Sequence, residues 1–157
     1  MDNSLVVVMG SDRARFFTLE QAEWPEYESG PDLIERDRVV YSDLSYRHRL
    51  WSSLLGKSEA EADSSLEHNS RLDNRFGQKI ISQIINFVRV NQYEKLILVA
   101  PHQILELISE FFIPTLFRNL EIITVEQDVS NLTSLQIQQY LAQKDMVPAY
   151  QKAVYPA

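Results

Sequence analysis

Residues 76–101 read FGQKIISQIINFVRVNQYEKLILVAP, and this stretch joins the pattern of an amphipathic helix to that of a buried strand. The run LILVA at 96–100 is apolar throughout and predicts a strand that is covered on both faces. A helix over 76–91 is predicted because apolar side chains recur at helical spacing, at Phe76, Ile80, Ile81, Ile84, Ile85 and Val88. A helix that alternates with strands requires crossover connections and parallel pairing, so this stretch indicates an α/β domain.

The alternation of helix and strand continues toward the C-terminus. Pro101 suits the first position of a helix, which we expect to run to about Phe112. The residues IITV at 122–125 predict the next strand. The residues TSLQ at 133–136 have the spacing of a capping box, so a last helix is predicted to begin there and to end near Gln143.

The N-terminal part of the chain predicts a meander of three strands. The apolar run at 5–9 is the first strand, and the turn residues at 10–12 connect it to a second strand at 13–19. A third strand is predicted at 33–41, although its charged centre, ERDR at 35–38, interrupts any alternation.

The order of these elements is β-β-β, a long insertion, and then α-β-α-β-α, which is the order found in the ribonuclease-H-like fold. We therefore predict an α/β fold with a mixed five-stranded sheet and helices on both faces. The 157 residues are expected to form a single domain. Its parts are a strand meander at 1–41, a long polar insertion at 42–75, an α/β half at 76–143 and an irregular tail at 144–157.

The composition excludes several classes of site and predicts a location. The chain has no cysteine, which excludes disulfides, thiolate metal sites and a cysteine nucleophile, and a cytoplasmic location is expected. The N-terminus has no basic lead-in, and no apolar run approaches the ~20 residues that span a bilayer, so we expect no membrane insertion. The net charge of -7 argues against broad binding to nucleic acid.

A basic and aromatic cluster, SYRHRLWSSLLGK at 45–57, contrasts with this acidic balance. It has three interpretations: a helix docked on the body through Trp51 and Leu55, a surface for a protein partner, or an RNA-binding surface. The acids in SEAEAD at 58–63 weaken the RNA interpretation. The candidate binding residues of this cluster are Tyr46, Arg47, His48, Arg49, Trp51 and Lys57.

Four residues outside the cluster are further candidates. Arg13 and Arg15 alternate along a predicted strand and share one face, which, if exposed, suits a phosphate or a carboxylate. His102 follows a strand at the end where open α/β sheets bind ligands, and it is a weak catalytic candidate together with Asp128. The first strand carries no carboxylate for a metal-dependent nuclease, and we expect neither a metal nor a cofactor.

Three segments carry a resemblance to a known family: LVVVMGSDRARFF at the start, FGQKIISQIINFVRVNQYEKLILVAP, and IITVEQDVSNLTSLQIQQYL. Together they resemble the bacterial host-attachment protein family over about residues 4–143. That family is similar to the central domain of the class-one peptide release factors. Release factors use a Gly-Gly-Gln loop between the third strand and the first helix. The resemblance therefore implies that the insertion of this chain occupies the position of that loop.

This chain lacks the Gly-Gly-Gln loop. Its four glycines are at positions 10, 30, 56 and 77, and Gly77-Gln78 falls in the first turn of a predicted helix. The resemblance therefore implies a non-catalytic binding module, associated with a ribosome or RNA. One alternative is a module for protein interaction or self-assembly through the Trp51 region, and another is a small hydrolase that uses His102 and Asp128.

Overall fold

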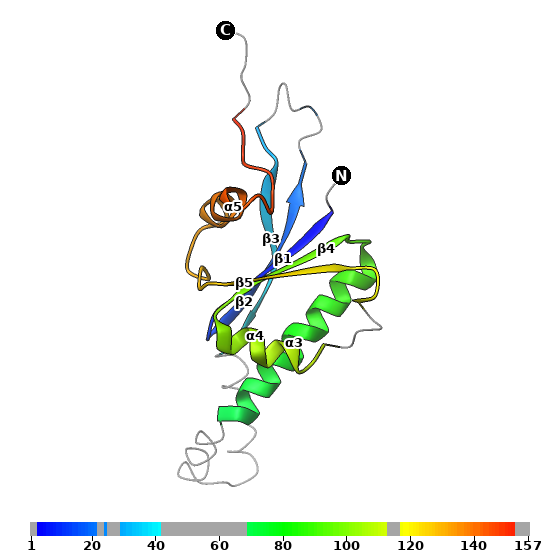
Figure 1. The fold of residues 1–157 in the computed structure, drawn as a ribbon, viewed down its shortest axis with the longest axis vertical. Helices are drawn as coiled ribbons and strands as arrows, with labels where there is room; N and C mark the ends of the chain where they lie inside the picture. The colour runs from blue at the N-terminus through cyan, green and yellow to red at the C-terminus, as the bar shows by residue number, and fades with distance from the viewer. Residues whose placement is uncertain (1–2, 22–23, 25–28, 42–68, 113–116, 153–157) are drawn as a thin grey trace.

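A mixed sheet of five strands forms the centre of the computed structural model, which describes residues 3–21, 24, 29–41, 69–112 and 117–152 (Figure 1). The strand order across the sheet is β3-β2-β1-β4-β5. The described elements in chain order are β1 (Ser4–Met9), β2 (Arg13–Glu20), β3 (Asp32–Val40), α3 (Asn69–Val90), β4 (Lys95–Ala100), α4 (His102–Ser109), β5 (Glu121–Glu126) and α5 (Ser134–Gln143). The predicted α/β fold and its element order are confirmed.

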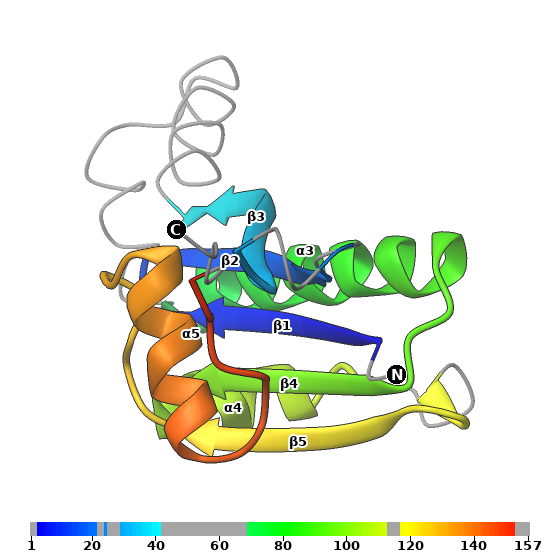
Figure 2. The same cartoon turned by 90° about the horizontal axis from the view of Figure 1, so that it is seen from above.

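The sheet combines the meander and the parallel half that the sequence predicts. β1 pairs antiparallel with β2, and β2 pairs antiparallel with β3. β1, β4 and β5 pair in parallel, and Figure 2 shows their arrowheads at the same end of the sheet. The turn between β1 and β2 is closed by the Gly10 amide, which donates to the Arg13 carbonyl at 2.8 Å. Both halves of the sheet therefore share β1 as their central strand.

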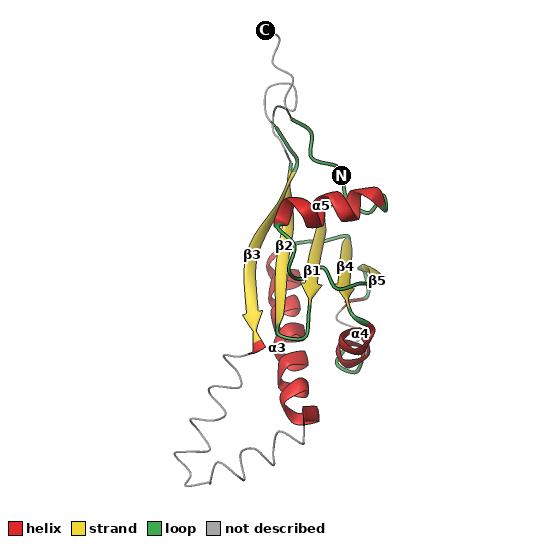
Figure 3. Cartoon of the chain, turned by 90° about the vertical axis from the view of Figure 1, so that its left-hand side faces the viewer, coloured by secondary structure: helices red, strands yellow, loops and turns green. Residues whose placement is uncertain are grey.

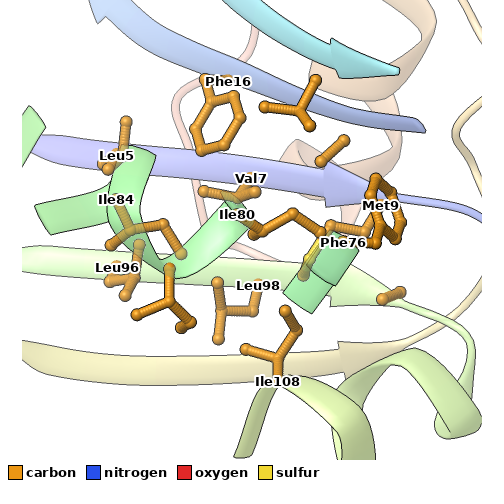
Figure 4. Packing of buried hydrophobic residues seen from close by; sticks show 14 of the residues in the cluster. Leu5, Val7, Met9, Phe16, Phe76, Ile80, Ile84, Leu96, Leu98 and Ile108 are labelled. Carbon is orange, nitrogen blue, oxygen red and sulfur yellow. The ribbon is translucent and has the colours of Figure 1, made fainter. Parts of the chain in front are cut away.

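Helices cover both faces of this sheet, and each face has its own apolar core. In Figure 3, α5 crosses in front of the strands and α3 runs behind them. Figure 4 shows the core beneath α3 and α4, whose labelled members are Leu5, Val7, Met9, Phe16, Phe76, Ile80, Ile84, Leu96, Leu98 and Ile108. The core beneath α5 contains Val6, Val8, Phe17, Leu33, Ile97, Val99, Val125, Val129, Ile137, Leu141 and Val147. Successive residues of β1 belong to alternate cores, because strand side chains alternate between faces.

Two helix boundaries differ from the prediction. α3 begins at Asn69 rather than at residue 76, so it includes residues predicted as insertion. Its first turns, NSRLDNR, have no apolar stripe, and the sequence therefore gives no signal for them. α4 starts at His102 with Pro101 as its N-cap and ends at Ser109 rather than near residue 112. The Phe111 amide donates to the Ile108 carbonyl at 3.0 Å, a tight turn that closes the helix.

The remaining elements follow the sequence closely. The capping box of α5 is present, since the Gln136 amide donates to Thr133 Oγ1 and the Thr133 amide donates to Gln136 Oε1. The charged ERDR centre lies in β3, where the pairing with β2 shifts: Phe16 is opposite Asp37, and Phe17 is opposite Glu35. Such a shift is a β-bulge, and it explains why the alternation is interrupted there. Among the described helices, none combines the length and the apolar character needed to cross a membrane.

Candidate functional site

One end of the sheet collects three of the residues that the sequence nominates, Arg13, His102 and Asp128, and a fourth, Arg15, lies beneath it. β3 runs in the same direction as β1 because both are antiparallel to β2, so β1, β3, β4 and β5 all end here. We call this end the carboxyl edge and define it as residues 10–13, 41, 101–102, 106 and 126–130. Open α/β sheets bind ligands at this end of their strands, so the carboxyl edge is the candidate site.

Arg15 lies beneath the carboxyl edge and is buried, with 7% of its surface exposed. Its Nη1 donates to the carbonyls of Ser130 at 3.0 Å and Leu132 at 2.6 Å, and its Nε donates to Glu35 Oε1 at 2.5 Å. The guanidinium also stacks 5.0 Å from the centre of the Phe17 ring. Arg15 therefore holds the turn after β5 against β2, and its charge faces the interior of the protein.

This placement corrects the expectation of an exposed pair of arginines. Arg13 does share its side of β2 with Arg15, but only Arg13 reaches the surface, with 32% of its side chain exposed. Its Nη2 lies 3.1 Å from Asp12 Oδ2 and its Nε lies 3.3 Å from Asp12 Oδ1. The hydrogen bond from Arg13 lowers the pKa of Asp12. The two arginines therefore have separate tasks, because the turn after β5 covers only Arg15.

Gly10 allows β1 to end directly against the turn after β5. A Cβ atom at Gly10 would lie 2.4 Å from Ser130 Oγ and 3.6 Å from Asp128 Oδ1. Asp128 Oδ1 accepts hydrogen bonds from the Ser130 amide at 3.2 Å and from Ser130 Oγ at 2.8 Å. Glycine is needed here for close approach, and Asp128 acts as a turn residue that fixes Ser130.

His102 bridges two glutamates on the surface of the carboxyl edge. Its Nδ1 lies 2.6 Å from Glu126 Oε1, and its Nε2 lies 2.7 Å from Glu106 Oε1. The hydrogen bond to Glu126 and the charge of Glu106 raise the pKa of His102. Both ring nitrogens donate in the imidazolium form, so this geometry favours a charged histidine held between two carboxylates.

The sequence interpretation missed both partners of His102. Glu106 lies one helical turn after His102, and the i, i+4 spacing was a usable signal. Glu126 is brought next to His102 by the parallel register of β4 and β5, in which Ala100 is opposite Glu126. This register follows from the way the two strands pair and not from the order of residues in the chain.

We expect the pKa of His102 to fall when Glu126 is replaced by glutamine, because the largest cause of its elevation is removed. The raised pKa means that the ion pairs stabilise the fold fully below the ordinary histidine pKa of about 6.5. This contribution is lost as the pH rises through the raised value. An NMR titration of the His102 ring, assigned with His102→Gln, measures the shift.

Glu121→Gln is the matched control for this titration, since Glu121 lies at the opposite end of the same strand. The control should leave the pKa of His102 where it is in the unmodified protein. Equal titration curves for Glu126→Gln and the unmodified protein would mean that the pair does not form in solution.

The basic cluster of the sequence analysis follows the carboxyl edge in the chain. Tyr41 lies at this edge: its amide donates to the Asp12 carbonyl at 2.7 Å, and its ring packs edge-on against Phe76. The candidate binding residues Tyr46, Arg47, His48, Arg49, Trp51 and Lys57 lie outside the described residues. Their proposed roles therefore rest on the sequence alone.

A family model described as "Protein required for attachment to host cells" matches residues 5–141. The chain belongs to this family. The match runs from β1 into α5 and so includes every strand of the described sheet. The resemblance to the host-attachment family is confirmed, whereas the comparisons give no support for a likeness to release factors. No curated protein matches the sequence.

The carboxyl edge of this host-attachment domain consists mainly of charged side chains that are held in place by hydrogen bonds and ion pairs. Among the described residues, no group of three or more histidine, aspartate or glutamate side chains is arranged to hold a metal ion. His102 and Asp128 bond to different partners, glutamates in one case and Ser130 in the other. The carboxyl edge is therefore an exposed, mainly acidic surface. Its turns are held by the hydrogen bonds of Arg15 and packed closely at Gly10.

Proposed function

We propose that this member of the host-attachment family is a non-catalytic binding module that binds a protein partner at its carboxyl edge. The observation that carries the proposal is the pairing of the polar side chains there. Asp12 pairs with Arg13, His102 with two glutamates, and Asp128 with its own turn. These pairs give the surface a fixed shape and charge, which is what recognition requires.

The charges favour a partner that presents a basic segment. Asp12, Glu106, Glu126 and Asp128 are exposed, while the described cations of this edge are the paired Arg13 and His102. Complementary charge speeds association and disfavours partners of like charge. This acidic surface would repel the phosphates of RNA, so a protein is a more suitable partner than RNA.

Association with a ribosome or RNA is the finer proposal that the resemblance to release factors suggests. It depends on the basic cluster at 45–57 and not on the described carboxyl edge. Peptide release itself is disfavoured at Gly77-Gln78: Gly77 is buried inside α3, and a Cβ there would lie 2.8 Å from the Phe111 ring. A glycine packed within a helix cannot act as a mobile catalytic loop.

A pull-down with and without nuclease tests the protein-binding proposal. We expect a complex that survives nuclease and is lost with Glu126→Lys, because this change reverses a charge on the carboxyl edge. Glu121→Lys is the matched control, with the same change at the other end of the exposed strand. Protein binding at this edge is excluded when both variants bind as strongly as the unmodified chain.

Three further measurements separate the alternatives. Co-sedimentation with ribosomal subunits that is lost on nuclease treatment, with added salt and with Arg47→Glu favours the RNA proposal. A nuclease-resistant complex that is insensitive to Glu126→Lys but lost with Trp51→Ala moves the interface to the cluster at 45–57. A hydrolase predicts turnover that His102→Ala abolishes.

A further inference from the structure

A polar cavity lies on the α3 side of the sheet, away from the carboxyl edge. Its volume is about 430 Å³. It lies near the residues that precede β1 and β4 and near the last turn of α3. The side chains that line it include Thr18, Arg36, Asp37, Phe87, Asn91 and Tyr93.

The β-bulge in β3 places a cation and an anion side by side in this cavity. In a regular strand, Arg36 and Asp37 would point to opposite faces of the sheet. The pairing shift after Phe16 removes this alternation. Arg36 Nε donates to Thr18 Oγ1 at 2.8 Å, and the Asp37 carboxylate accepts from Gln83 of α3, so both side chains face α3. Bulges are over-represented beside binding sites because they redirect side chains in this way.

Both charged groups keep capacity for a ligand. Arg36 has five N–H donors; within the described residues one bonds to Thr18, and another lies 3.5 Å from a Glu20 oxygen. The Asp37 oxygens accept from the Arg38 amide and from Gln83, and each carboxylate oxygen has a second lone pair. The cavity therefore presents open donors next to open acceptors.

Aromatic groups complete the lining. The Phe87 ring stacks on Phe16 with 5.5 Å between ring centres and an angle of 7° between the planes. Burial raises the pKa of the Tyr93 hydroxyl, and the nearby charge of Arg36 acts in the opposite direction. Tyr93 and Arg36 both line the cavity. A ligand that fits this lining has both charges at one end and an apolar body at the other.

We propose that this cavity binds a small zwitterion of the free amino-acid class, with its carboxylate on Arg36, its ammonium group on Asp37 and an apolar side chain against Phe87 and Tyr93. Arginine matches the planar geometry of a carboxylate, and the aspartate supplies the balancing charge. The adjacent anion disfavours a phosphate or another polyanion. This site lies outside the carboxyl edge and is independent of the function proposed there.

Titration of the full chain with L-phenylalanine, followed by NMR, tests the proposal. We expect saturable shifts confined to β2, β3 and the end of α3. N-acetyl-L-phenylalanine lacks the ammonium group and L-phenylalaninamide lacks the carboxylate, so both should bind more weakly by about tenfold or more. L-alanine should also bind more weakly, because it lacks the ring.

Arg36→Gln and Asp37→Asn should each weaken L-phenylalanine binding by about tenfold or more. Arg38→Gln is the matched control, because Arg38 is a neighbouring exposed arginine that bonds to Glu35 on the other face. The proposal is overturned by absent saturation, by equal binding of the N-acetyl compound, or by an equal loss with Arg38→Gln.

Discussion

Replacing Arg15 with methionine is expected to lower the free energy of unfolding by about 3 kcal/mol, the largest stability effect that we expect from a single polar residue here. Methionine has a similar length, so the packing on Phe17 is largely kept. The change leaves the carbonyls of Ser130 and Leu132 without their charged donor in a buried setting. Urea denaturation of the two proteins measures the difference.

Arg38→Met is the control for this prediction. Arg38 also bonds to Glu35, but 43% of its side chain is exposed, and such surface pairs contribute about 0–1 kcal/mol. Hydrogen exchange adds a local readout, since the amides of the turn after β5 should exchange faster in Arg15→Met only. Similar losses in the two variants would show that the internal hydrogen bonds of Arg15 do not stabilise the turn.

The burial of Arg15 is a feature that the sequence did not predict. The alternation of Arg13, Ala14 and Arg15 correctly indicates a strand and a shared face. Whether that face is open depends on Ser130 and Leu132, which are more than a hundred residues away in the chain and meet Arg15 only after the sheet has formed. Local periodicity contains no information on such a contact, so the burial of Arg15 could not be predicted.

The parallel half of the fold was predictable for the opposite reason. The apolar run of β4 and the apolar stripe of α3 are strong local signals, and β4 is buried on both faces as its run indicates. The run IITV also indicates a strand, but β5 lies at the edge of the sheet, where Val125 is buried and Ile122 is exposed. The start of α3 was not predictable, because its first turns have no apolar stripe. The bulge in β3 appeared in the sequence only as an interrupted alternation at ERDR. The sequence did not indicate toward which face of the sheet each of these side chains points.

The second large effect is expected from a single methyl group at Gly10. Gly10→Ala should lower the free energy of unfolding by about 1–3 kcal/mol, the usual range for overpacking a rigid interior. The added Cβ would lie 2.4 Å from Ser130 Oγ and 3.0 Å from Ser130 Cβ. Ser130 cannot move away easily, since its carbonyl is held by Arg15 and its hydroxyl by Asp128. Thermal and urea unfolding measure the loss.

A double-mutant cycle identifies the cause of that loss. Ser130→Gly removes both atoms that the new methyl group would meet, so Gly10→Ala should cost little in its presence, with a coupling energy of about 1–2 kcal/mol. If the two changes were instead additive, the close approach of β1 to the turn after β5 would not limit this position. A coupling of this size would show that the acidic turn carrying Asp128 is held against the sheet by direct packing.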